Sequence, residues 1–356
     1  MPTTELKTDI DQLCINTIRT LSVDAIQKAN SGHPGLPLGM APTAYVLWTR
    51  FLRHNPKNPH WFNRDRFVLS GGHGSMLIYS LLHLTGYESV TMDEIKNFRQ
   101  FESKTPGHPE NHITTGVEVT TGPLGAGSSN AVGLAIAEKH LAARYNKDDA
   151  KIVDNQVYAI VSDGDLQEGV SGEASSLAGH LKLGNLTFFW DDNSITIDGS
   201  TELSFTENVL QRYEAYGWHT QTVINGNDLE EIENAIREAQ KVTDKPSIIA
   251  VKTIIGFGLP KQGTSKAHSD APGVDAVKEM KRNLNWDENA EFYVPDEVYA
   301  KYREAIPNGE KLENEWNEIL KTYTEKYGVE FLDLINKTFP ENWESALPSF
   351  EGVEAK

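Results

Sequence analysis

The chain has 356 residues, of which 38% are hydrophobic, and a formal net charge of −18. This size suffices for one large core or two domains, whereas the acidity argues against a nucleic-acid-binding surface, which needs a basic stripe. No run approaches the ~18 apolar residues of a membrane helix, and the single cysteine, Cys14, excludes an internal disulfide framework, so we expect a cytoplasmic protein.

In the first 150 residues, apolar side chains recur mostly at helical spacing. Cys14 falls on the apolar side of the first helix, which predicts a buried structural thiol rather than a nucleophile. Helices are predicted at residues 9–29, 41–52, 76–84 and 128–141, and a short strand at 66–70.

From about residue 152, short apolar runs alternate with helical patterns. Strands are predicted at residues 157–161, 186–190, 220–224 and 247–254, and helices at 172–183, 209–216 and 229–242. This order predicts an α/β fold with a parallel sheet that is covered by helices on both faces.

The end of the chain has a different composition. From about residue 290 it is rich in Glu, Lys, Tyr and Trp with scattered prolines, and helices are predicted at 312–327 and 329–336. We therefore divide the chain into an α/β ligand-binding domain, residues 1–320, and a helical tail and linker, residues 321–356.

Two polar residues follow neighbouring predicted strands. Asp163 comes directly after the strand at 157–161, and Asn193 follows the strand at 186–190. The carboxyl ends of parallel strands are where open α/β sheets bind ligands. A carboxylate and an amide, with further oxygens from phosphate and water, suit Mg²⁺. The alternative is structural, since Asp163 could cap the next helix and Asn193 could make a turn.

Four loops combine glycine with histidine or with the start of a helix. Glycine lets backbone N–H groups approach a ligand, a histidine can donate to phosphate or move protons, and a helix start attracts anions. Each loop alone is also compatible with a simple turn, but the combination with Asp163 and Asn193 favours a site. The loops span residues 31–35, 71–75, 105–109 and 121–127.

Several longer motifs occur together along almost the whole chain. They are KANSGHPG (28–35), LGMAP (38–42), NRDRFVLS (63–70), TPGHPE (105–110), EVTTGPLG (118–125), EASSLAGHLKLGNL (173–186), DDNSITIDG (191–199) and NWESALP (342–348). In these motifs the chain resembles the N-terminal, diphosphate-binding (PP-type) domain of the transketolase family. The family uses thiamine diphosphate to move two-carbon ketol units between sugar phosphates, so the resemblance implies a transferase of carbohydrate metabolism.

The resemblance implies a cofactor site built from named residues. Asp163 and Asn193, with the backbone carbonyl of Ile195, would hold Mg²⁺ or Ca²⁺ on the cofactor diphosphate, which the backbone would approach at Gly164. His73 would contact the diphosphate.

Further roles follow from the same resemblance. Gly122 and Leu124 would lie along the thiamine, and Glu168 would join a subunit-interface network beside the cofactor. His268 would contact the diphosphate and line the active site. The catalytic residues would be His33, His108 and His268. His33 and His108 would face the donor's hydroxyls, and His33 and His268 would be the candidates for proton transfer.

The sequence departs from the family pattern at three places. Ser162 stands where a glycine is usual before the metal-binding aspartate, and Ala126 replaces a glutamine. After His268, the pair Ser269-Asp270 adds a residue and an acid. These changes could alter the shape of the pocket or tilt His268.

The motifs of the family's second and third domains do not occur in the chain. We therefore expect a cofactor-binding half that needs a pyrimidine-domain partner, as one subunit of a two-chain transketolase or as a fragment of a longer one. A dimer or higher oligomer is expected, and neither nucleic acid nor a membrane is an expected partner. The alternatives are a catalytically idle binding or assembly protein that keeps the fold, and a dihydroxyacetone-synthase-like ketol transferase.

Overall fold

The computed structural model of the protein describes residues 9–352 and 354. Residues 1–8 of the expected domain and residues 353, 355 and 356 of the expected tail lie outside the described residues. Within the described part, no helix is long and apolar enough to cross a membrane.

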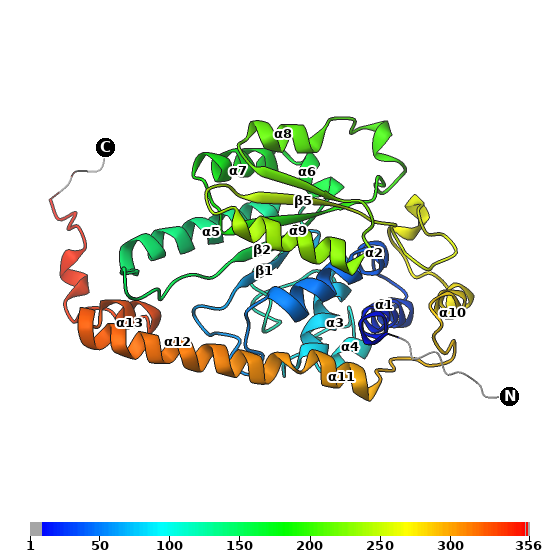
Figure 1. The fold of residues 1–356 in the computed structure, drawn as a ribbon, viewed down its shortest axis with the longest axis horizontal. Coiled ribbons are helices and arrows are strands. Elements are labelled where there is room, and N and C mark those ends of the chain that lie inside the picture. Colours follow the sequence, from blue (N-terminus) through cyan, green and yellow to red (C-terminus); the bar gives the residue numbers. More distant parts are fainter. Residues whose placement is uncertain (1–8, 353, 355–356) are drawn as a thin grey trace.

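A sheet of five parallel strands lies at the centre of the fold, as the sequence predicts (Figure 1). The strands stand in the order β1-β2-β3-β5-β4, and every neighbouring pair is parallel. Their bounds are β1 Arg66–Leu69, β2 Val157–Ser162, β3 Leu186–Asp192, β4 His219–Val223 and β5 Ser247–Lys252.

Helices connect and surround the strands. The α-helices are α1 Ile10–Ala29, α2 Gly35–Val46, α3 Met76–Thr85, α4 Met92–Lys96, α5 Ala126–Tyr145, α6 Asp163–Gln167, α7 Gly169–His180, α8 Val209–Ala215, α9 Leu229–Lys241, α10 Val274–Asn283, α11 Asp296–Tyr302, α12 Ala305–Tyr327 and α13 Glu330–Ile335. Shorter turns are η1 Leu47–Phe51, a π-helix, and the 3-10 helices η2 Gly72–Gly74, η3 Thr201–Leu203, η4 Ser265–Ala267 and η5 Trp343–Ala346.

Successive strand residues enter two separate cores, because side chains of a strand alternate between its faces. In β2, Tyr158 and Ile160 pack with α1, α2, α3 and α9, whereas Ala159 and Val161 pack with α5, α7 and α8. In Figure 1, α7 and α8 lie above the sheet and α1 and α3 below it. The prediction of helices on both faces is confirmed. Cys14 is buried in the first core, as its position in α1 predicts.

Some sequence predictions of helices were wrong at their bounds. The second helix begins at Gly35 rather than at residue 41, because Pro34 and Pro37 fit a first turn, where the missing N–H groups have no intrahelical partner. Pro295 starts α11 in the same way, and that helix was missed, as were α4 and α10.

Helix α12 carries the C-terminal part of the chain along one side of the domain, in orange in Figure 1. Trp316, Leu320 and Tyr323 pack with Trp61 and Tyr145 in a third core. The helix runs without a break through residues 320 and 321, where we place the domain boundary. That boundary stays a prediction.

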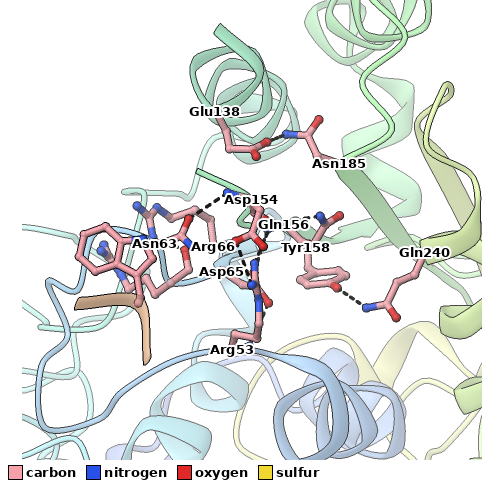
Figure 2. A network of polar contacts seen from close by, with 12 residues as sticks. Arg53, Asn63, Asp65, Arg66, Glu138, Asp154, Gln156, Tyr158, Asn185 and Gln240 are labelled. Carbon is pink, nitrogen blue, oxygen red and sulfur yellow. Dashed lines mark hydrogen bonds and ion pairs between the residues drawn. The ribbon is translucent and has the colours of Figure 1, made fainter. Parts of the chain in front are cut away.

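A polar network closes the amino-terminal edge of the sheet (Figure 2). Arg53 donates from Nη2 to Asp65 Oδ1 at 3.1 Å and from Nη1 to Asp154 Oδ1 at 3.0 Å. Asp65 Oδ1 also accepts from the backbone N–H of Gln156 at 2.8 Å, just before β2. These contacts tie the starts of β1 and β2 together, so the opposite, carboxyl-terminal edge is the one left for a ligand.

Candidate functional site

A cavity of about 620 Å³ lies at the carboxyl ends of β2, β3 and β5. Most of the residues that the sequence singles out line its wall. They are His33, His73, Gly122, Leu124, Asp163, Gly164, Glu168, Asn193, Ile195 and His268. His108 lies just behind this wall, since a Cβ atom on Gly122 would be 3.3 Å from its Cγ atom.

The Asp163 carboxylate has one oxygen engaged and one free among the described residues. Its Oδ1 accepts a hydrogen bond of 2.9 Å from Trp190 Nε1, while its Oδ2 is buried without a partner. An unpartnered buried oxygen is costly unless a ligand satisfies it. Burial raises the pKa of Asp163 to about 7, and the nearby Asp191 and Asp192 act in the same direction. A divalent cation at Oδ2 would remove that penalty.

Two hydrogen bonds fix the side chain of Asn193, which lines the same cavity as Asp163. Its Nδ2 donates to Asp191 Oδ2 at 3.0 Å, and its Oδ1 accepts from the backbone N–H of Ile195 at 2.9 Å. Asp191 is anchored in turn by the hydroxyl of Thr253, which donates to its Oδ1. This chain of contacts fixes the Asn193 side chain, and Asn193 and Ile195 line the same cavity as Asp163.

The donor set fits Mg²⁺ or Ca²⁺. No cluster of three or more His, Cys, Asp or Glu side chains that could hold a metal occurs in the described part of the chain. A cation here would therefore take one carboxylate, one amide and one carbonyl from the protein and its remaining oxygens from a ligand, which is how Mg²⁺ is held on phosphates. The unpartnered Oδ2 of Asp163 is the observation that supports this fit.

Glycines let the backbone approach closely at this edge of the sheet. A Cβ atom on Gly164 would lie 2.8 Å from Leu124, and one on Gly72 would lie 2.6 Å from Thr121 Oγ1. Leu124 and Thr121 therefore pack directly against the backbone of Gly164 and Gly72. A substitution at either glycine would push one of these side chains out of its place beside the cavity.

Three histidines from three separate loops converge at the cavity. The ring centroids of His33 and His73 are 5.3 Å apart, those of His33 and His268 5.5 Å, and those of His73 and His268 5.1 Å. Burial is the main cause that lowers their pKa values, to about 4 for His33 and about 3 for His73. Burial also lowers the pKa of His268 and of His108. The rings are therefore neutral at pH 7, able to donate or accept a proton in a hydrogen bond.

Ser162, the first departure from the family pattern, is accommodated by Asp165. The Ser162 hydroxyl donates to Asp165 Oδ2 at 2.9 Å and caps α6 by accepting from the Asp165 backbone N–H at 3.3 Å. Asp165 Oδ1 accepts from Ser70 Oγ at 2.7 Å and from the Gly125 N–H at 2.8 Å. Asp165 thus joins the ends of β1 and β2 to the 121–127 loop, a role that the sequence analysis missed.

The other two departures from the family pattern, at Ala126 and at Ser269-Asp270, also lie at defined positions in the fold. Ala126 is the first residue of α5, directly after the left-handed Gly125. Asp270 has a φ of 71°, and its N–H donates to the Gly32 carbonyl at 2.8 Å. The inserted acid therefore links the His268 loop to the His33 loop.

Glu168 and two charged residues complete the surroundings. Glu168 is exposed at the cavity rim, beside the position that a Cβ on Gly125 would take. Lys252 Nζ lies 2.5 Å from Asp192 Oδ2 and offsets part of the acidity around Asp163. Arg99 donates to Nδ1 of His33. Neither Lys252 nor Arg99 is signalled by the sequence motifs.

Residues 10–340 match the family model described as "Transketolase, thiamine diphosphate binding domain". The chain belongs to the transketolase family. Its fold and residue pattern are those of the family's cofactor-binding domain, whose cofactor is thiamine diphosphate with a divalent ion such as Mg²⁺ or Ca²⁺.

Curated transketolases are similar to the chain over almost its whole length. The chain is 57% identical over 346 residues to a transketolase of Nostoc sp. and 54% identical over 347 residues to that of Geobacillus stearothermophilus. In both cases the match covers 96% of this chain and 52% of the relative. The chain thus spans about half the length of the curated relatives it matches.

Solved transketolase structures have the same fold. A Pichia stipitis transketolase in complex with sedoheptulose 7-phosphate superposes with a TM-score of 0.95 at 49% identity, covering 98% of this chain and 52% of the other. The transketolase of Leishmania mexicana gives 0.93 at 46% identity, covering 96% and 51%.

Proposed function

We propose that this chain is the cofactor-diphosphate-binding half of a transketolase. With a pyrimidine-binding region supplied by a partner, it would transfer a two-carbon ketol unit from a ketose, or ketose phosphate, to an aldose, or aldose phosphate. The observation that carries the proposal is the buried, unpartnered Oδ2 of Asp163 in the wall of the cavity. Family membership supports the same assignment.

The metal and diphosphate would be held by residues at the ends of β2 and β3. Asp163 Oδ2, the Asn193 amide oxygen and the Ile195 carbonyl would coordinate the divalent ion. Gly164 would allow the backbone to approach the diphosphate, because it has no side chain on the cavity wall. His73 would donate a hydrogen bond to a diphosphate oxygen.

The rest of the cavity would hold the organic part of the cofactor and the substrate. Gly122 and Leu124 would lie along the thiamine, and Glu168 at the rim would belong to a subunit-interface network. When bound, the cofactor supplies the carbanion chemistry that C–C bond cleavage requires. His33, His108 and His268 would bind the substrate hydroxyls, and His268 would also contact the diphosphate.

The oligomeric state and location are part of the proposal. A dimer is supported by the apolar residues Val170, Leu177 and Leu181, which are 46%, 45% and 44% exposed at and along α7. A cytoplasmic location is proposed too, although several relatives carry the word chloroplastic in their names. Sedimentation and cell fractionation would test these two points.

Calorimetry tests the proposed cofactor site directly. Thiamine diphosphate should bind the chain in the presence of Mg²⁺ and lose affinity at least tenfold when EDTA replaces Mg²⁺. Asp163→Ala should abolish the Mg²⁺ dependence, whereas Asp149→Ala, at an exposed aspartate paired with Lys326, should not. If no binding occurs, or if both variants bind like the wild type, the proposal is wrong and the alternative of a catalytically idle assembly protein is favoured.

A second experiment tests the transfer reaction. The chain mixed with a pyrimidine-binding transketolase region, thiamine diphosphate and Mg²⁺ should transfer a ketol unit from a ketose phosphate to an aldose phosphate. Formaldehyde as acceptor separates a dihydroxyacetone-synthase-like enzyme from a transketolase. Absence of transfer with every acceptor, despite cofactor binding, would contradict the catalytic part of the proposal.

A further inference from the structure

Arg99 makes a contact with His33 that the proposed function does not use. Its Nη2 atom lies 3.2 Å from Nδ1 of His33, and its Nη1 donates to Ser31 Oγ at 2.8 Å. Both partners belong to the same Gly-containing loop, residues 31–35. The planar guanidinium therefore contacts this loop at two points. These contacts orient the His33 ring as well as the backbone of the loop.

The backbone conformation at Arg99 places the guanidinium beside the loop of residues 31–35. Arg99 has a φ of 62°, a left-handed conformation that costs free energy in a residue with a side chain. Its N–H donates to the Thr105 carbonyl at 2.9 Å. A Cβ atom on Gly107 would lie only 3.1 Å from Arg99 Nε. The guanidinium thus lies between the loops of His33 and His108, against a residue that has no side chain.

The charge of Arg99 is not neutralised by an acid of the described residues. Within the described residues, no Asp or Glu oxygen forms an ion pair with it, although its side chain is only partly exposed. The groups that face His33 are His73, His268, His108 and Asp270, in addition to Arg99. Of these, Asp270 alone favours a positive His33.

The contact decides which nitrogen of His33 carries the proton. A guanidinium can only donate, so the Nδ1 atom that it contacts must accept and carries no hydrogen. A neutral imidazole with a bare Nδ1 has its hydrogen on Nε2. In the described part of the chain, Nε2 has no hydrogen-bond partner, while the ring lines the cavity.

We propose that Arg99 is a positioning residue that fixes His33 as a neutral Nε2–H donor toward the substrate. In this state His33 has no free lone pair on the ring, because Nδ1 is occupied and Nε2 is protonated. It can hydrogen-bond a substrate carbonyl or alkoxide oxygen without giving up its proton, as neutral imidazoles do at other enzyme sites. It cannot act as the general base, which leaves proton acceptance to another group, such as His268.

This inference rests on the proposed function for its catalytic meaning, but its first test does not need the cofactor or the reaction. Two-dimensional ¹⁵N NMR of the histidine-labelled chain reports which ring nitrogen is protonated, and His33→Phe identifies the His33 signals. The wild type should show Nδ1 unprotonated and shifted by an accepted hydrogen bond, and Nε2 protonated. A proton on Nδ1 would overturn the proposal, whatever the variants do.

Two variants test whether Arg99 is the cause. Imidazoles in water already favour a proton on Nε2, so the decisive signal is the Nδ1 resonance. Arg99→Met should move it toward the value of a free ring nitrogen and raise the pH midpoint of His33, because a donor and a positive charge are both lost. Arg99→Lys keeps the charge but cannot make both contacts with Ser31 and His33. The Nδ1 shift should therefore lie between those of the wild type and Arg99→Met.

A matched control completes the test. Arg237→Met removes an arginine from the outer side of α9, where it pairs with Glu233, and should leave the His33 signals unchanged. If Arg99→Met and Arg99→Lys also leave Nδ1 and the midpoint unchanged, Arg99 does not position His33. In the reconstituted enzyme, Arg99→Met should lower kcat about tenfold or more with a smaller effect on KM. Loss of cofactor binding would instead show that Arg99 acts on the cofactor site of Asp163.

Discussion

The indole Nε1 of Trp190 donates a hydrogen bond of 2.9 Å to Oδ1 of Asp163. The other carboxylate oxygen, Oδ2, is buried and has no hydrogen-bond partner among the described residues. Trp190 lies at the end of β3 and Asp163 directly follows β2, so the contact also spans two neighbouring strands at the edge of the sheet. Trp190 therefore sets the orientation of the proposed metal ligand.

Removing this donor should weaken metal-dependent cofactor binding. We expect Trp190→Phe to lower the affinity for thiamine diphosphate with Mg²⁺ by about tenfold, the lower end of the range for partners that orient metal ligands. Calorimetry at saturating Mg²⁺ measures the change. Trp218→Phe is the matched control, because Trp218 is buried in the same core but donates to the Ser175 carbonyl instead. Equal losses in both variants would show that packing, not the contact with Asp163, is responsible.

Ser162 should contribute to stability rather than obstruct the cofactor. Ser162 and Asp165 form a capping box, in which the Ser162 hydroxyl accepts from the Asp165 N–H and Asp165 Oδ2 accepts from the Ser162 N–H. Ser162→Ala should therefore lower the free energy of unfolding by about 1 kcal/mol in urea titrations, and Ser162→Gly by a few tenths of a kcal/mol. Neither should change cofactor affinity more than twofold, because Trp190 still holds Asp163. A clear gain in affinity in Ser162→Gly would contradict this and show that the hydroxymethyl group narrows the site.

The strands and the edge that carries the site could be predicted from the sequence. Buried parallel strands are short apolar runs, and polar residues at their ends must meet at one edge, which placed Asp163 and Asn193 correctly. That the pair suits Mg²⁺ was predicted from the residues themselves, whereas the cofactor diphosphate as its ligand came from the resemblance, and both roles remain proposals. The predicted start of the second helix, at residue 41, was wrong because Pro34 and Pro37 suit the first turn of a helix.

Contacts between distant loops could not be predicted. Arg99 and His33 are 66 residues apart, and their contact depends on a left-handed backbone at Arg99 that no local pattern signals. The four hydrogen bonds that the Asp165 carboxylate accepts come from Ser70, Gly125 and Ser162, and thus from three segments. Such contacts depend on the tertiary structure. The sequence shows the chemistry of each side chain but not which side chain it will contact.

Two glycines in α5 should respond in opposite ways to alanine. A Cβ atom on Gly127 would lie 2.5 Å from the Cα atom of Ser70, so Gly127→Ala should lower the free energy of unfolding by about 1–3 kcal/mol through overpacking. Apart from its chain neighbours and the nearby backbone of α5, a Cβ atom on Gly133 would meet no atom of the described residues within 4 Å, so Gly133→Ala should raise stability by up to about 1 kcal/mol. Urea unfolding of both variants measures the difference. A destabilised Gly133→Ala chain would show that another surface covers this part of α5.

The buried carboxyl group of Glu138 should make stability depend on pH. Glu138 lies on α5 in contact with the Asn185 amide (Figure 2), and burial raises its pKa from 4.5 to about 7. Between these values the folded chain keeps a proton that the unfolded chain releases. The contribution is therefore present below pH 4.5 and is lost as the pH rises to about 7.

Glu138→Gln isolates this effect, because glutamine keeps an acceptor for Asn185 but cannot ionise. Relative to the wild type, the variant should gain stability between pH 5 and pH 8, by roughly 3 kcal/mol at most. Urea titrations at several pH values measure the difference, in which the parallel contributions of Asp163 and Asp191 cancel. Glu330→Gln, at an exposed glutamate, serves as the control. A stability difference that stays constant with pH would mean that Glu138 is already ionised in the folded chain.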